Sequence, residues 1–167
     1  MHTPEQARLL FRIRLVLLLF MIALVLSGAT AIATPWETRL LCEWFGAGTA
    51  VGETLPPLAD WLSQVREALD TVDEQYPLLL YGTDWLAFAH LVIAVAFIGP
   101  LRDPVKNVWV IDFGMIACMA VIPLALICGP IRGIPFWWRL IDCSFGVVGI
   151  IPLALVRRWT ERLAAAL

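Results

Sequence analysis

Charge is scarce in this sequence, and so are the residues and motifs that usually carry catalysis. Only 16% of the 167 residues are charged and 60% are hydrophobic, whereas about a quarter of the residues in a soluble domain are charged. There are only two histidines, and the four cysteines lack metal-site spacing, so we interpret them as small buried hydrophobes. No G-x-S-x-G, P-loop or H-E-x-x-H motif occurs, and no basic run suggests a nucleic-acid partner. The composition indicates an integral membrane protein and does not identify its activity.

The hydrophobic residues are concentrated in blocks whose length suits a helix crossing about 30 Å of hydrocarbon. We therefore predict an all-α membrane protein, a four-transmembrane-helix bundle in which residues 1–167 form a single membrane domain. The lipid bilayer is the expected surrounding of these helices. The predicted spans are residues 15–33, 85–101, 108–128 and 136–156.

The first block has a rival interpretation as a secretory signal peptide. It follows a basic N-terminus and ends in small residues, with possible cleavage sites at Ala29–Ala31 or Ala31–Ala33. We prefer a retained helix because the block is longer than the apolar region of a signal peptide. Its removal would also leave an odd number of spans with a poorer charge balance.

Residues 34–84 form the most polar region, in which acidic residues far outnumber Arg39 and Arg66. Apolar residues recur there at helical spacing, which predicts an amphipathic helix between spans one and two. They are Leu58, Trp61, Leu62, Val65, Leu69 and Val72. The acidic polar face argues against docking on anionic lipid, since interfacial helices favour Lys and Arg there. Packing on the helical bundle or on a partner is the preferred interpretation.

The distribution of basic residues predicts the topology. With the N-terminus in the cytoplasm, most of the basic residues fall on the cytoplasmic side, as the positive-inside bias requires. They are Arg8, Arg12, Arg14, Arg102, Lys106, Arg157, Arg158 and Arg162. Both termini are then cytoplasmic, and residues 34–84 are extracytoplasmic.

Some polar residues in or near the spans are costly enough to need a reason, since a charge within hydrocarbon costs about 2.5–3.5 kcal/mol on insertion scales. We expect these residues to face one outer-leaflet cavity: Asp84, His90, Arg132, Arg139 and Asp142. Two interpretations stay open, of which the first is preferred. The residues form ion pairs that pin the acidic segment to the bundle, including an intrahelical pair of Arg139 with Asp142, or they form an anion-binding or proton-handling pocket.

His90 and Asp112 have their own alternatives. A lone intramembrane histidine can bind a haem iron or a chlorophyll magnesium, or can relay protons. A hydrogen-bonded histidine at a helix interface is the preferred interpretation of His90. For Asp112, near the start of the third span, a structural pair at the membrane boundary is preferred, with Arg102 and Lys106 close by in sequence.

Two Gly-Pro motifs follow the second and third spans, with an arginine close behind each. Gly99-Pro100 and Gly129-Pro130 are expected to stop these helices, and the arginines to meet the negative ends of the helix dipoles. Together with residues 81–90, the stretches 99–104 and 129–136 resemble a group of uncharacterised bacterial four-helix inner-membrane proteins. The resemblance covers roughly the second half of the chain. It implies a multi-pass protein of the bacterial inner membrane and adds no activity.

Small size, the lack of catalytic motifs, eight tryptophans and small-residue helix faces favour a non-catalytic subunit. We expect an accessory or scaffold subunit of a larger bacterial membrane complex, of the respiratory or photosynthetic type. Other membrane protein subunits are then its partners. The alternatives are a small membrane enzyme or carrier that uses the outer-leaflet pocket, and a haem, quinone or chlorophyll binder that uses His90.

Overall fold

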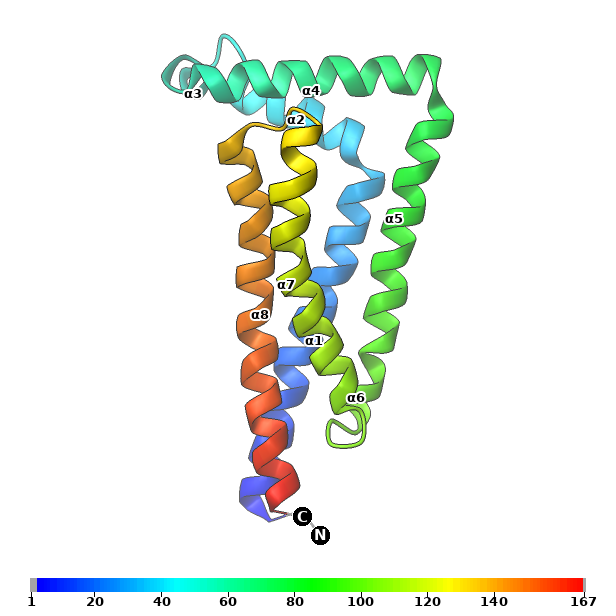
Figure 1. Cartoon of the computed structure of the whole chain (residues 1–167), viewed down its shortest axis with the longest axis vertical. Helices are drawn as coiled ribbons and strands as arrows, with labels where there is room; N and C mark the ends of the chain where they lie inside the picture. The colour runs from blue at the N-terminus through cyan, green and yellow to red at the C-terminus, as the bar shows by residue number, and fades with distance from the viewer. Residues whose placement is uncertain (1–2, 167) are drawn as a thin grey trace. The chain divides into compact units, whose positions relative to one another are not determined.

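The computed structural model describes residues 3–166, which are helical almost throughout (Figure 1). No β-strand occurs among them, so the predicted all-α fold is confirmed. In chain order the helices are α1 (Pro4–Ile32), α2 (Thr34–Phe45), α3 (Ala50–Thr54), α4 (Pro56–Gln75), α5 (Pro77–Ala96), α6 (Ile98–Arg102), α7 (Val108–Ile131) and α8 (Phe136–Ala165).

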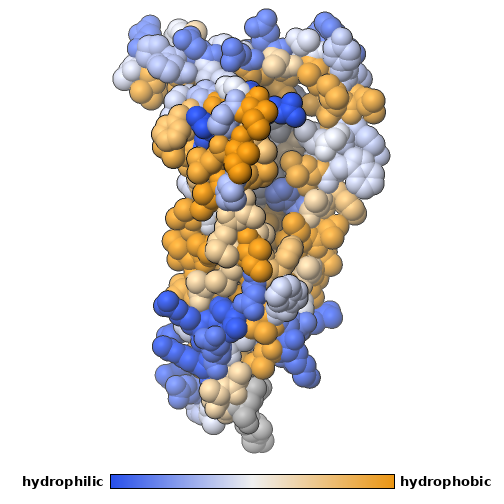
Figure 2. Space-filling view, in the orientation of Figure 1, coloured by the Kyte–Doolittle hydropathy of each residue, from blue (hydrophilic) through white to orange (hydrophobic). Residues whose placement is uncertain are grey.

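Within the described chain, 4 helical stretches are long and apolar enough to cross a membrane. Their most apolar windows have mean hydropathies of 2.7 (Pro4–Ile32), 1.8 (Pro77–Arg102), 2.4 (Val108–Ile131) and 1.9 (Phe136–Ala165). Large apolar side chains remain exposed along them, and on the face shown in Figure 2 such side chains cover the middle of α8. Contiguous apolar surface of this extent is not left in water. These helices therefore contact the lipid bilayer, as predicted.

The helices extend beyond the predicted hydrophobic blocks. α1 already begins at Pro4, so the basic N-terminal residues are helical. α5 begins at Pro77 rather than at Trp85, and α8 continues to Ala165 through the basic C-terminal stretch. Hydropathy identifies the part of a helix that suits lipid. It does not locate the helix ends, which depend on capping and on local contacts.

Residue contacts divide the chain into two compact units. Unit 1 contains the residues up to Ala23 and those from Ala94 onward, hence the first part of α1 together with α6, α7 and α8. Unit 2 is Leu24–Ile93, which holds the end of α1, α2 to α4 and most of α5. The prediction that residues 1–167 form one domain stays a prediction.

In unit 1, α7 and α8 pack closely because glycines remove side chains from their contact. A Cβ atom on Gly146 of α8 would overlap the carbonyl oxygen of Cys118 in α7. A Cβ atom on Gly114 of α7 would come within 2.7 Å of the Phe97 ring and 2.9 Å of Leu153 in α8. Small residues of this kind let two backbones approach each other in lipid, where apolar side chains gain little by leaving the solvent.

The first part of α1 completes the core of unit 1. Ile13 and Leu17 have no exposed surface, and the Phe20 ring lies 5.0 Å from that of Phe97. The side chain of Gln6 is buried and donates a hydrogen bond of 2.6 Å from Nε2 to the carbonyl of Ala166. This bond holds the start of α1 against the end of α8.

The prediction that Gly99-Pro100 stops the second span is wrong. Both residues belong to α6, which ends at Arg102. The carbonyls of Leu101 and Arg102 accept hydrogen bonds of 3.1 and 3.3 Å from the guanidinium of Arg14 in α1. Arg102 lies in the last turn of α6, at the negative end of the helix dipole as expected, and Arg14 is a second arginine that meets this end.

The prediction for Gly129-Pro130 is wrong in the same way, because both residues lie inside α7. The glycine that ends the helix is Gly133, whose φ of 71° lies in the left-handed region that favours glycine. The N–H of Ile134 donates to the Gly129 carbonyl at 2.9 Å, and that of Gly133 donates to Pro130 at 3.2 Å. These two bonds make a Schellman motif.

In unit 2, α4 is the amphipathic helix that the sequence predicts between spans one and two. Its apolar stripe is buried or half-buried, with Ala59 and Leu62 nearly inaccessible, and it packs against α2. Each of these two helices has a proline in its first turn, a position that needs no N–H donor. Apart from the half-buried Asp70, the acidic residues on the other faces of α4 are exposed: Asp60, Glu67, Asp73 and Glu74.

Candidate functional site

The residues that the sequence groups into one polar pocket fall into two sets. Asp84 and His90 lie on α5 in unit 2. Arg132 follows the last residue of α7, and Arg139 and Asp142 lie in the first turns of α8, all in unit 1. Each unit therefore has its own polar group, and a pocket that contains all of these residues stays a prediction.

A cavity of about 270 Å³ lies beside the turn between α7 and α8. Arg132 and Asp142 both line it, so the fold brings these two predicted residues to one place. No ion pair joins them among those found in residues 3–166. A cationic and an anionic side chain at one apolar cavity can orient a small polar molecule. The remaining lining is mostly apolar: Val121, Leu124, Ala125, Cys128, Gly129 and Ile134.

Arg139 is held by a glycine and an aromatic ring. Its aliphatic stem lies against Gly129 of α7, where a Cβ atom would overlap it. Its guanidinium carbon lies 5.1 Å from the centre of the Phe136 ring, within the range of a cation–π contact. The intrahelical pair with Asp142 is not among the ion pairs of the described residues. The glycine of the second Gly-Pro motif thus makes room for Arg139.

His90 is a hydrogen-bonded histidine at a contact between two helices. Its Nδ1 lies 2.8 Å from the carbonyl oxygen of Leu86, which can only accept, so Nδ1 carries the proton. A Cβ atom on Gly28 of α1 would lie 3.1 Å from the His90 Cβ, which shows how closely α1 passes. In a neutral imidazole this tautomer has the lone pair on Nε2. Within the described residues, no group of three or more His, Cys, Asp or Glu could hold a metal ion.

Asp84 is exposed on α5, one turn and a half before His90 along the chain. It takes part in none of the ion pairs or side-chain hydrogen bonds found within unit 2. An exposed carboxylate needs no protein partner when water or lipid head groups surround it.

Asp112 forms the structural pair that the sequence favours, but with a residue distant in the chain. Its Oδ1 lies 2.7 Å from Nε of Arg157 in α8, and Nη1 of Arg157 lies 2.7 Å from Glu161. Lys106, which is nearer in sequence, pairs with Asp103 at 3.5 Å instead. The backbone N–H of Lys106 also donates to Asp103 and, as the largest cause, lowers the pKa of that carboxyl.

The sequence predictions overlooked an ion-pair network between α2 and α4. Nη2 and Nε of Arg39 donate to Oδ1 of Asp70 at 2.8 and 3.2 Å, and Nε of Arg66 lies 3.5 Å from Oδ2. The hydrogen bond from Arg39 is the main cause that lowers the pKa of Asp70, and it raises the pKa of Arg39. The network could have been predicted from the sequence, because Arg39 and Arg66 are isolated cations in an acidic segment.

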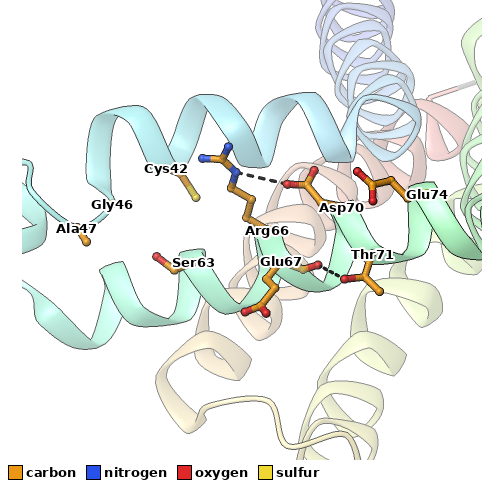
Figure 3. Close-up of a pocket in the computed structure, with 9 residues that line it drawn as sticks. All are labelled: Cys42, Gly46, Ala47, Ser63, Arg66, Glu67, Asp70, Thr71 and Glu74. Atoms are coloured by element: carbon orange, nitrogen blue, oxygen red, sulfur yellow. Dashed lines mark hydrogen bonds and ion pairs between the residues drawn. The ribbon is translucent and has the colours of Figure 1, made fainter.

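A second cavity, of about 470 Å³, lies beside this network (Figure 3). Its lining combines a thiol, hydroxyls and charged groups, with Ser63, Arg66 and Asp70 on α4 facing Cys42 on α2. The Cys42 thiol donates to the Leu62 carbonyl at 3.4 Å, and the Thr71 hydroxyl donates to the Glu67 carbonyl at 2.8 Å. The thiol and this hydroxyl are thus engaged with the helices themselves, and the cavity is a polar groove between α2 and α4.

Comparison with known proteins gives no relative. No model of a protein family matches the chain, and neither a curated protein nor a solved structure matches it. The structure by itself places the chain among helical membrane proteins with 4 candidate spans in its described part.

Proposed function

We propose that this chain is a non-catalytic accessory or scaffold subunit of a larger complex of the bacterial inner membrane, of the respiratory or photosynthetic type. The observation that carries this proposal is the acidic surface of α4. The apolar stripe of α4 is used within unit 2, whereas Asp60, Glu67 and Glu74, which are seven residues apart and share one face of the helix, are exposed and have no ion-pair partner there. A helix that is held in place and keeps a charged face free suits docking to a basic surface of another subunit.

We further propose that both termini are cytoplasmic and that α2, α3 and α4 lie on the extracytoplasmic side. In unit 1 the start of α1, α6 and the end of α8 are tied together by the bonds of Gln6 and Arg14. This end collects basic side chains, which cytoplasmic segments favour. In a variant without native cysteines, a membrane-impermeant thiol reagent applied to intact cells should label Glu53→Cys and spare Arg158→Cys. The reverse pattern would refute the orientation.

The subunit proposal can be tested by charge neutralisation on α4. A tagged wild-type chain should copurify companion polypeptides in fixed stoichiometry after mild detergent extraction. The double variant Glu67→Gln with Glu74→Gln should lose them, because it removes two exposed carboxylates of the docking face. The matched control is Glu43→Gln with Glu53→Gln, which removes two exposed carboxylates of α2 and α3 and should keep them.

Two results would count against the proposal. One is a wild-type chain that purifies alone in a mild detergent, with no companion at fixed stoichiometry. The other is equal retention of companions by both double variants, which would show that the α4 face is not the docking surface. A thermal unfolding midpoint equal to that of the wild type establishes that each variant is folded.

A second candidate function is a small membrane enzyme or carrier, favoured by the cavity that Arg132 and Asp142 share. Its substrate would be a small polar molecule that meets one cation and one anion. Such a protein purifies as a small colourless particle, and Arg132→Gln should abolish its ligand binding or transport. A cofactor on the free Nε2 of His90 is a third possibility, which predicts a visible absorption band that His90→Gln removes.

A further inference from the structure

The ends of α1 and α8 form a basic pocket that the proposed function does not use. It has a volume of about 830 Å³ and is lined by Arg8 and Arg12 of α1 and by Arg162 of α8. None of these arginines takes part in the ion pairs found among residues 3–166. Glu5 is the acidic residue in the described lining, so the pocket keeps a net positive charge.

Local structure fixes where these arginines lie. The Thr3 N–H donates to Oε1 of Gln6 at 2.8 Å, and the Gln6 N–H donates to the Thr3 hydroxyl at 3.3 Å, which is a capping box at the start of α1. Nε2 of the same Gln6 donates to the Ala166 carbonyl at 2.6 Å. Since Arg162 is one turn before Ala166, this bond brings its side chain to the first turns of α1.

An apolar stripe continues from the arginines along α1. Residues four and three apart lie on one face of a helix, so Leu15, Leu19 and Ile22 follow Arg8 and Arg12 on the same side. These aliphatic side chains are 44%, 57% and 46% exposed. A cationic pocket at the end of a candidate span, followed by exposed aliphatic surface, has the polarity pattern of a phospholipid.

We propose that this pocket binds the phosphate of an anionic membrane phospholipid, whose acyl chains lie along Leu15, Leu19 and Ile22. Guanidinium groups hold phosphate oxygens through paired, charge-assisted hydrogen bonds. Three arginines from two helices can surround one head group, and basic residues beside a span attract anionic lipid. Bound lipid would then also fasten the start of α1 to the end of α8.

The test is native mass spectrometry of the full chain in a neutral detergent, titrated with phosphatidylglycerol or with phosphatidylcholine. Phosphatidylglycerol should bind more tightly to the wild type. The variant Arg8→Gln with Arg12→Gln should bind it about 30-fold more weakly, since each basic residue contributes roughly fivefold. Lys106→Gln with Arg158→Gln removes the same charge outside the pocket and should change binding by less than about threefold.

Arg162→Gln provides an independent variant on the other helix, and it should weaken phosphatidylglycerol binding by about fivefold. Equal weakening by the pocket variant and by the control would overturn the proposal, because it would reduce the effect to net charge. Equal binding of the two lipids would overturn it as well. A third arm adds inorganic phosphate alone: if phosphate displaces the lipid at millimolar concentration, the site is a phosphate site and the lipid assignment is wrong.

Discussion

The α2–α4 pair and the α7–α8 pair hold two helices together by different means. Between α2 and α4, the apolar stripe of α4 is buried and the partly exposed Arg39–Asp70 ion pair lies at the edge. Between α7 and α8, glycines such as Gly146 bring the backbones together, and Asp112 pairs with Arg157. The contact between α2 and α4 is made by buried side chains. The contact between α7 and α8 is made mainly by backbones that approach each other at glycines.

The proposed topology, with water around the α2–α4 pair and lipid around the α7–α8 pair, accounts for this difference. In water, apolar side chains drive helices together because burial removes them from the solvent. In lipid this drive is lacking, so association depends on close packing at small residues. An amphipathic stripe is therefore the sequence signal for the α2–α4 pair. For α7 and α8, which expose large apolar side chains such as Leu124 and Phe145, small residues are the signal.

Gly146→Leu should have the largest effect, because the added side chain meets the Cys118 backbone of α7. We expect a loss of about 4 kcal/mol or more in the free energy of unfolding, or failure to fold. Thermal unfolding in detergent measures it. The control is Gly82→Leu on α5, where a Cβ atom meets nothing within 4 Å. Equal effects of the two substitutions would remove the role of glycine in the α7–α8 contact.

Leu62→Ala tests the other pair. The side chain is 3% exposed, so truncation should cost about 2–4 kcal/mol through lost burial and a cavity. Limited proteolysis of the α3–α4 segment in the full-length protein would report the loosened contact. Leu78→Ala, at a side chain that is 77% exposed, should change little. A negligible effect of Leu62→Ala would show that burial does not hold α4.

Asp112→Asn should have a smaller effect, of about 1–2 kcal/mol, because it removes a charge-assisted hydrogen bond from a partly exposed site. The thermal midpoint in detergent should fall. Arg157 keeps Glu161 as a partner, which limits the loss. Asp103→Asn removes a more exposed pair with Lys106 and serves as the control. A larger loss for Asp103→Asn would contradict the assignment of Asp112 as the structural carboxylate.

The smallest effect should be the pH dependence from Asp70. Because its pKa is lowered in the folded state, chiefly by the hydrogen bond from Arg39, ionised Asp70 stabilises the fold above the ordinary pKa of an aspartate. This stability is lost as the pH falls through the lowered pKa. Arg39→Gln should flatten the acid limb of a plot of thermal midpoint against pH. High salt should do so too, since both side chains are partly exposed.

The sequence was sufficient for the features that depend on local pattern. Long apolar blocks predicted the four candidate spans, and the spacing from Leu58 to Val72 predicted the buried stripe of α4. It failed where the partner is distant in the chain. Arg14 binds carbonyls of α6, and Asp112 pairs with Arg157. These partners are far apart in the chain and become neighbours only when the helices pack.

The Gly-Pro pairs show a different limit of prediction from the sequence, which is that the role of a glycine is ambiguous. Gly129 was expected to end α7, yet a glycine is useful both at a left-handed position and where another side chain passes closely. The first role belongs to Gly133, and Gly129 serves Arg139. The cavity of Arg132 and Asp142 could be predicted as a cluster beside a turn. That Arg139 uses an aromatic ring instead of Asp142 depends on rotamers, which spacing does not reveal.

The most direct test of the proposed role is the size and absorption spectrum of the particle that holds the untagged chain after mild detergent extraction from native membranes. We predict a particle much larger than one chain with its detergent, containing other polypeptides, and any pigment present would identify the complex. A small, colourless particle that contains this chain alone would contradict the subunit role and would direct attention to the cavity of Arg132 and Asp142.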